Sequence, residues 1–228
     1  FFPVGDFCKY DPQTDGWTKM SFDSDAFTKR TGAVAFVVNG KAYVGSGRDV
    51  DDKELNDFWE YNPATLQWRK VADMPASAAR YEAVAFTIGN YGYVGTGQFG
   101  ATPLRDFWRF RPPADSTDPG EWMPVAPLPP EAAARYQAVA FAIDTFGYIA
   151  TGYHPTAGYL NDVWRYDAAA DKWTQKTPFQ GVARTNALGF AISGYGYLGT
   201  GNTKVQLNGG LSSAERSLPD IWRYIPEQ

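Results

Sequence analysis

The sequence predicts an all-β fold, a propeller of four-stranded antiparallel blades, and three observations lead to this prediction. An 18-residue segment that begins at an arginine and ends at a glycine occurs four times; at residues 80–97 it reads RYEAVAFTIGNYGYVGTG. The arginines that open the copies are 50, 55 and 49 residues apart, and periods near 50 are those of propeller blades rather than helical solenoids. A tryptophan-containing block follows every copy.

The repeated segment supplies the first two strands of each blade. Residues 83–88 (AVAFTI) are a short apolar run, Gly89 and Asn90 make a turn, and residues 91–94 (YGYV) form the next strand. Small and large residues alternate in these strands. This alternation is typical of inner strands, where neighbouring blades converge and the available space narrows.

The tryptophan blocks supply the two outer strands. NDFWEY at residues 56–61 matches RDFWRF at 105–110, NDVWRY at 161–166 and PDIWRY at 219–224, and each block predicts a third strand. A turn rich in Pro, Asn, Asp and Ala comes next, before a fourth strand that is marked by Trp68, Trp122 or Trp173.

The repeats cover residues 1–228, which we interpret as one domain. Complete repeats occupy residues 30–79, 80–134 and 135–183, residues 1–29 supply only third and fourth strands, and residues 184–228 lack an outer strand. A propeller is often closed by a strand from its other terminus, because closure removes an exposed sheet edge. We therefore expect five or six blades in a longer protein with additional upstream sequence.

The order of motifs resembles the kelch repeat, in the variant found in the central domain of galactose-oxidase-like proteins. The shared order is an arginine, an apolar strand, aromatic-x-x-Gly-x-Gly, a Trp-x-Tyr block and a further Trp, and it covers essentially the whole chain. The kelch double glycine is Gly-Ser/Thr-Gly here, with Ala150 in place of the first glycine in one copy. The resemblance implies the propeller fold but no single function, because one scaffold hosts many sites.

The repeat places four arginines in an arc around one mouth of the central channel: Arg30, Arg80, Arg135 and Arg184. One interpretation is an electropositive ring that binds a carboxylate or another anion through bidentate guanidinium contacts. The other is architectural, with each arginine bonded to carbonyl groups or to a neighbouring blade. Repetition in every copy favours the architectural interpretation.

The two residues after each arginine vary between copies: Thr31-Gly32, Tyr81-Glu82, Tyr136-Gln137 and Thr185-Asn186. Variable positions in a constant frame are where a binding site can arise. The predicted ligand-binding residues are therefore Arg30, Arg80, Tyr81, Glu82, Arg135, Tyr136, Gln137, Arg184 and Asn186.

A repeated aspartate precedes every third strand: Asp6, Asp57, Asp106, Asp162 and Asp220. A carboxylate present in all blades is expected to cap a turn or to pair with an arginine rather than to catalyse. The loops between second and third strands differ most. We expect the longest, residues 202–219 with Asn208-Gly209-Gly210, to be mobile.

Several classes of function are disfavoured. A net charge of −4 argues against a general nucleic-acid surface, and the chain has no run of 18 or more apolar residues that could span a membrane. The acidic loop at residues 48–54 lacks the glycine and distal glutamate of a calcium loop, and no phosphate-binding loop is present, so no metal or cofactor is predicted. The oxidase's copper site is not expected with one histidine, His154. Cys8 replaces a repeat tryptophan, so we expect it to fill a packing position.

The sequence favours a non-catalytic binding or scaffold propeller that presents its loops or its arginine-lined mouth to a carbohydrate, peptide or protein partner. Loop aromatics such as Phe99, Tyr153 and Tyr159 suit such contacts. The alternative is a sugar-acid epimerase or mutarotase, which the family resemblance implies, with Glu82 acting beside Arg80 and Arg135. The resemblance also implies export, to the periplasm, the cell surface or the medium.

Overall fold

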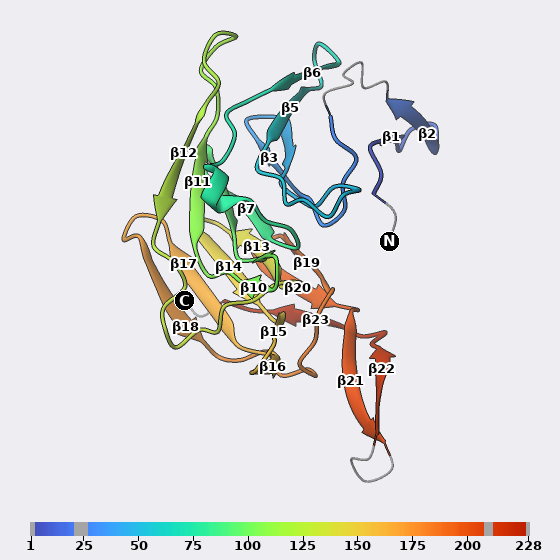
Figure 1. Ribbon diagram of the computed structural model, residues 1–228, viewed down its shortest axis with the longest axis vertical. Coiled ribbons are helices and arrows are strands. Elements are labelled where there is room, and N and C mark those ends of the chain that lie inside the picture. Colours follow the sequence, from blue (N-terminus) through green and yellow to red (C-terminus); the bar gives the residue numbers. More distant parts are fainter. Residues whose placement is uncertain (1–2, 21–26, 208–211, 227–228) are drawn as a thin grey trace.

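The structure is a computed structural model that describes residues 3–20, 27–207 and 212–226 (Figure 1). Within these ranges the chain is all-β, with one short 3-10 helix, η1 (Ala76–Ala78). No helix in the described part is long and apolar enough to cross a membrane.

Each repeated segment folds into a hairpin. In the first hairpin, the turn residues Asn39 and Gly40 have φ of 51° and 74°, as a two-residue hairpin turn requires.

Three four-stranded sheets form the complete blades, and each follows the chain as an antiparallel meander. The first blade contains β3 (Val34–Val38), β4 (Lys41–Gly45), β5 (Phe58–Asn62) and β6 (Gln67–Lys70). The second contains β7 (Val84–Ile88), β8 (Tyr91–Gly95), β11 (Phe107–Arg111) and β12 (Glu121–Val125). The third contains β13 (Val139–Ile143), β14 (Phe146–Ala150), β17 (Val163–Asp167) and β18 (Lys172–Lys176).

Two partial sheets complete the predicted pattern. The last sheet has three strands, β19 (Leu188–Ile192), β20 (Tyr195–Gly199) and β23 (Ile221–Tyr224), and the first has two, β1 (Phe7–Asp11) and β2 (Gly16–Met20). The predicted fold class, a kelch-type propeller with three complete and two partial blades, is confirmed.

Three small hairpins that were not predicted occupy the loops between second and third strands. They are β9 (Gln98–Phe99) with β10 (Thr102–Pro103), β15 (Tyr153–His154) with β16 (Gly158–Tyr159), and β21 (Asn202–Leu207) with β22 (Ser212–Ser217). The last is the longest loop of the chain. Its predicted mobile segment, Asn208-Gly209-Gly210, lies outside the described residues.

The first strands of successive sheets lie side by side, in the order β3, β7, β13 and β19 (Figure 1). Small residues of these strands line a groove of about 260 Å³ along the inner side, among them Ala35, Ala85, Ala140 and Gly189. The small and large residues of these strands therefore lie on different sides of the strand, as the alternation predicts. Small side chains face the channel, and large ones pack between blades.

Packing between blades relies on a phenylalanine of one blade that lies against a glycine of the next. The pairs are Phe36 and Gly92, Phe86 and Gly147, and Phe141 and Gly196. A Cβ atom on Gly147 would lie 2.3 Å from the Phe86 ring, so a larger residue at position 147 would displace the ring. The second strand of each blade thus carries a glycine where the preceding blade inserts its phenylalanine.

Ala150, the one departure from the repeated glycine pattern, is matched by a smaller partner. In the second blade Gly95 stands opposite Phe107, and a Cβ atom on Gly95 would lie 2.2 Å from that ring. In the third blade Ala150 stands opposite Val163. The smaller valine leaves room for the alanine methyl group.

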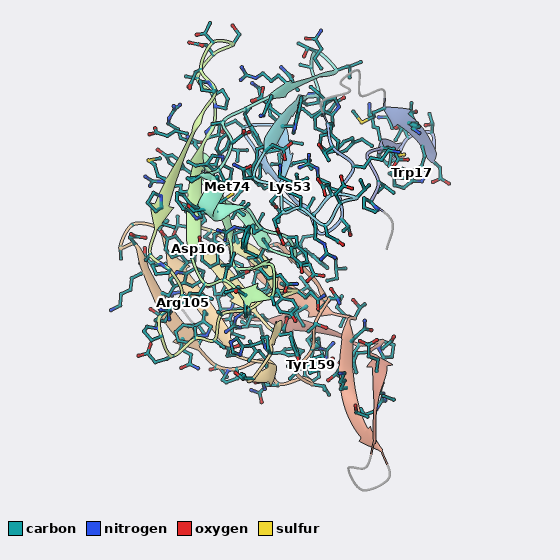
Figure 2. The ribbon with its side chains drawn as sticks, in the orientation of Figure 1. Trp17, Lys53, Met74, Arg105, Asp106 and Tyr159 are labelled. Carbon is teal, nitrogen blue, oxygen red and sulfur yellow. The ribbon has the colours of Figure 1, made fainter. Side chains whose placement is uncertain are left out.

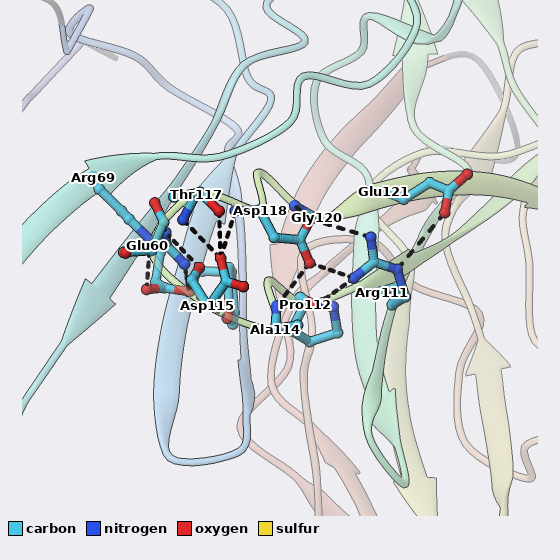
Figure 3. Close-up of polar contacts among 12 residues, drawn as sticks. Glu60, Arg69, Arg111, Pro112, Ala114, Asp115, Thr117, Asp118, Gly120 and Glu121 are labelled. Carbon is cyan, nitrogen blue, oxygen red and sulfur yellow. Dashed lines mark hydrogen bonds and ion pairs between the residues drawn. The ribbon is translucent and has the colours of Figure 1, made fainter.

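The turn between β11 and β12 is held by carboxylates and also contacts the first blade (Figure 3). Asp118 accepts hydrogen bonds from Arg111 Nη1 at 2.7 Å and from the backbone amides of Ala114 and Gly120. Arg69 of β6 pairs with the buried Glu60 and donates to the Asp115 carbonyl at 3.1 Å. These contacts hold the long turn and join the first and second blades at their outer edges.

An ion pair between a buried arginine and a partly exposed aspartate joins the first and third strands in the three complete blades and in the last sheet. Arg135, which precedes β13 and is 0% exposed, donates from Nη1 and Nη2 to the two carboxylate oxygens of Asp162, each at 2.6 Å. Trp164 Nε1 donates to the same carboxylate at 2.6 Å. Arg135 also donates to the carbonyls of Ala133 and Thr151, at 3.0 and 3.1 Å. The equivalent triads are Arg30, Asp57 and Trp59; Arg80, Asp106 and Trp108; and Arg184, Asp220 and Trp222.

These contacts keep the aspartates ionised. Burial, the largest influence on Asp57, Asp106 and Asp162, would by itself raise the pKa of each carboxyl group. The hydrogen bonds and charge of the paired arginine, with the indole hydrogen bond, outweigh burial and lower each pKa below its usual value. The pKa of Asp220 is lowered too, chiefly by its hydrogen bonds with Arg184.

The sheet formed by β1 and β2 departs from the repeat. Cys8 is exposed on β1, so the expectation that it fills a packing position was wrong. β1 pairs only with β2 among the described strands, and no inner strand covers the Cys8 side chain. Asp6, the repeat aspartate of this sheet, is also exposed and lies 3.9 Å from Lys19 rather than on a buried arginine.

We predict that Asp162→Ala lowers the free energy of unfolding by about 3–5 kcal/mol, because it leaves the charge of Arg135 buried without its partner. The matched control is Asp73→Ala, which removes an exposed ion pair with Lys70 and should cost at most about 1 kcal/mol. Urea denaturation followed by tryptophan fluorescence measures both. Equal losses in the two variants would contradict a structural role for the buried pair.

We predict that stability falls on acidification. The aspartates have lower pKa values when folded than the value of about 3.9 in an unfolded chain, so the unfolded state binds more protons in acid. Their contribution should be complete above about pH 5 and lost progressively as the pH falls through the lowered folded-state pKa values. Thermal unfolding between pH 7 and pH 3 should show a shallower acid loss for Asp162→Asn than for the wild type. Identical pH profiles would refute this assignment.

Candidate functional site

The four predicted arginines lie behind the channel mouth and not on its surface. Arg80, Arg135 and Arg184 are fully buried and Arg30 is 5% exposed. Their guanidinium groups donate to aspartates and carbonyls of their own blades, as the architectural interpretation expects. Backbone bonds extend this frame between blades, since Gly97 N donates to the Arg135 carbonyl oxygen at 2.8 Å. The arginines therefore position the residues that follow them.

The residues two positions after the arginines form a hydrogen-bonded chain from blade to blade. Glu82 N donates to the Gly32 carbonyl at 2.8 Å, Gln137 N to the Glu82 carbonyl at 3.1 Å, and Asn186 N to the Gln137 carbonyl at 3.1 Å. All four residues are left-handed, with φ between 52° and 63°. Such values are uncommon outside glycine, and this chain repeats them at Ser46, Thr96, Thr151 and Thr200, so they are a feature of the repeat.

The Glu82 carboxylate is fixed by two glutamine side chains. Gln98 Nε2 donates to one oxygen at 2.7 Å, and Gln137 Nε2 of the next blade donates to the other at 2.8 Å. Arg80 and Arg135, which the enzyme alternative placed beside this carboxylate, donate instead to Asp106 and Asp162. The result is a polar cluster of one carboxylate and two amides at the mouth.

Gln98 was not among the predicted residues, although the sequence contains a signal for it. It directly follows the last glycine of the repeated segment, where the other copies carry Arg48, Tyr153 and Asn202. These residues form backbone bridges to the position after the repeat arginine, as in Tyr81 with Gln98. This position varies between copies as strongly as the pairs after the arginines.

Aromatic side chains flank the polar cluster on both sides. The guanidinium of Arg48 lies 4.5 Å from the centre of the Tyr81 ring. On the other side the ring of Tyr153 lies 5.5 Å from Tyr136 and 5.3 Å from Tyr159. Burial raises the pKa of Tyr81, Tyr136 and Tyr159 above its ordinary value. The Tyr81 hydroxyl already donates to the Gly100 carbonyl at 3.4 Å.

Asp49 of the acidic loop and His154 make hydrogen bonds within their own loops. Asp49 Oδ1 accepts from the backbone amides of Asp51 and Lys53, each at 2.9 Å, so this carboxylate caps the acidic loop. Nδ1 of His154 lies 3.3 and 3.2 Å from the backbone nitrogens of Thr156 and Ala157. In the part of the chain that the structure describes, no three His, Cys, Asp or Glu side chains gather as metal ligands do.

Asn186 belongs to the mouth by its backbone but stands apart from the polar cluster. Its amide completes the hydrogen-bonded chain, while the residue itself is exposed, two positions before β19. Of the nine predicted residues, Tyr81, Glu82, Tyr136 and Gln137 thus share the mouth, and the four arginines support it from behind.

Comparisons with known proteins agree with this architecture. A family model described as the KLHDC2/KLHL20/DRC7 kelch-repeats domain matches residues 3–117. The solved structure of YjhT superposes with a TM-score of 0.73 at 16% sequence identity, over 96% of this chain and 72% of the YjhT chain. No curated protein sequence matches. The chain belongs to the kelch-repeat family.

Proposed function

We propose that the chain is a non-catalytic binding module that recognises a protein partner at the channel mouth. We call the residues of this site the mouth rim: Arg48, Tyr81, Glu82, Gln98, Tyr136, Gln137 and Tyr153. Tyr81 and Gln98 are only 8% exposed and hold Arg48 and Glu82, which are more exposed, in place. One observation carries the proposal. The arginines that repeat in every blade are buried and paired within their blades. Residues at positions that vary between copies contact one another at this one mouth.

The chemistry of the mouth rim suits a peptide segment. Tyrosine rings supply apolar contact with a polar end, and tyrosine and arginine are enriched among residues that dominate protein interfaces. Glu82 and Gln137 can offer acceptors and donors to a peptide backbone. Because Glu82 and Gln137 are held by contacts between blades, they need little reordering when a partner binds.

A carbohydrate partner is the second candidate, and the cluster of Tyr136, Tyr153 and Tyr159 favours it, because sugar rings stack on aromatic side chains. An exported or cell-surface location fits such a partner and belongs to this proposal. Fractionation of the source cells tests it, since recovery only from the cytoplasm would contradict export.

The enzyme alternative is less well supported by the geometry. An epimerase needs a proton-handling group next to a charged group that binds the sugar acid. Arg80 and Arg135 are already paired with Asp106 and Asp162, and Glu82 is engaged by two amides. The mouth therefore offers contacts for recognition rather than an assembled acid and base.

We predict that Tyr153→Ala and Glu82→Gln each weaken peptide binding at least tenfold, about 1.4 kcal/mol, because both remove contacts at the mouth rim. The probes are peptides selected from a displayed random library on the wild-type chain, and fluorescence anisotropy measures their affinity.

The matched control is Tyr195→Ala, which removes a tyrosine beside the turn between β19 and β20, away from the mouth rim. It should leave the affinity unchanged. Peptides that bind the mouth-rim variants as tightly as the wild type would overturn the proposed site. A glycan array that gives binders when the peptide library gives none would assign the rim to carbohydrate.

A further inference from the structure

The mouth rim contains one cationic residue, Arg48, and it lies on a tyrosine of the next blade. Its guanidinium group is 4.5 Å from the centre of the Tyr81 ring, and its Nη1 donates to the Tyr81 hydroxyl at 3.5 Å. Arg48 also pairs with Asp52 at 3.3 Å. The ring face and the carboxylate both attract the positive charge. The boundary between the first and second blades thus contains a cation of its own.

The boundary between the second and third blades repeats this arrangement without the cation. Gln98 occupies the repeat position of Arg48, and Tyr136 occupies that of Tyr81. The Gln98 side chain is neutral and donates to Glu82 at 2.7 Å. Among the described residues, no guanidinium or ammonium group lies over the Tyr136 ring.

The Glu82 carboxylate lies next to this ring. Gln137, which directly follows Tyr136, donates to one Glu82 oxygen at 2.8 Å, and all three residues are partly exposed. Burial is the main cause of the raised pKa of Tyr136, and the charge of Glu82 adds to it. The described residues give Glu82 two amide donors and no cation. Each oxygen accepts one amide and retains a lone pair, so the carboxylate can still accept both N–H groups of a guanidinium.

Three tyrosine rings of the third blade form a wall beside the carboxylate. The ring of Tyr153 makes T-shaped contacts with Tyr136 and Tyr159, and all three residues are partly exposed. Tyr159 lies at the outer end of this wall, near the β21–β22 hairpin (Figure 2). Because a T-shaped contact uses the edge of one ring and one face of the other, the three rings retain faces on which a cation can lie.

We propose that the mouth rim binds an arginine side chain of its partner, with the guanidinium group on the Glu82 carboxylate and over the Tyr136 ring. In this position the ligand has the relation to Tyr136 that Arg48 has to Tyr81. A guanidinium matches a carboxylate with two parallel hydrogen bonds and stacks on an aromatic face, whereas an ammonium is a compact and strongly hydrated charge. The inference rests on the function proposed above and names the group that the partner presents.

The first test uses two small probes of equal length, acetyl-arginine amide and acetyl-citrulline amide, of which only the first is charged. The arginine probe should give saturable NMR shifts of the side-chain amide signals of Gln98 and Gln137. The amide of Gln180, outside the mouth rim, should not shift. The citrulline probe should bind at least about tenfold more weakly. Equal affinity for the two probes, or shifts centred away from the mouth rim, would overturn the inference.

Two variants alter the site in different ways. Glu82→Gln removes the charge and should abolish the preference for arginine over citrulline. Gln98→Arg places an arginine of the chain itself at the repeat position of Arg48, keeps the carboxylate, and should weaken binding of the arginine probe at least about tenfold. The control, Glu121→Gln, removes an exposed carboxylate on β12 and should change nothing. Unchanged arginine affinity in Gln98→Arg would contradict the proposed position. The paired probes on the wild-type chain do not depend on the folding of any variant.

Peptides separate this inference from the function on which it rests. Peptides selected on the wild-type chain should contain an arginine whose replacement by citrulline weakens binding at least about tenfold. Selected peptides that bind the mouth rim and tolerate this replacement would overturn the arginine contact and leave the binding function standing. A response to the arginine probe without any peptide binder would support the contact and count against peptide recognition.

Discussion

The pair between a buried repeat arginine and a repeat aspartate is the interaction on which the structure depends. It joins the start of the first strand to the start of the third strand in every complete blade, and the indole of the third strand donates to the same carboxylate. An unpaired charge in this position would be costly, so the pair strongly favours one arrangement of the two strands. Backbone bonds from the Gly-Ser/Thr-Gly segment to the next arginine carry this order to the neighbouring blade.

This constraint separates architecture from recognition. Because the arginines are saturated by contacts of their own blades, the mouth owes its chemistry to the residues that follow them. Glu82 and Gln137 adopt left-handed backbone conformations there and are linked through backbone and side chain alike. The surrounding blades hold these backbone conformations, so the variable side chains are presented in fixed positions.

The period of the sequence predicted the strands of the three complete and two partial blades, because each copy repeats the same alternation of small and large residues. The period did not decide whether Arg80 contacts a ligand or Asp106. Periodicity shows which residues occupy equivalent positions in the copies, but not which side chains contact one another. Gln98 escaped prediction because its partner, Glu82, is brought near only by the bridge to Tyr81. Cys8 was misjudged because repeat position implies burial only where neighbouring strands cover it.

A double-mutant cycle between Arg80 and Asp106 tests the central claim most directly. The single variants Arg80→Met and Asp106→Leu each leave one partner of the pair, whereas the double variant removes both. If the pair is the structural frame, the double variant should be more stable than the sum of the single losses predicts, by at least about 2 kcal/mol. Losses that add within about 0.5 kcal/mol would show that the two groups are not coupled and would contradict the account.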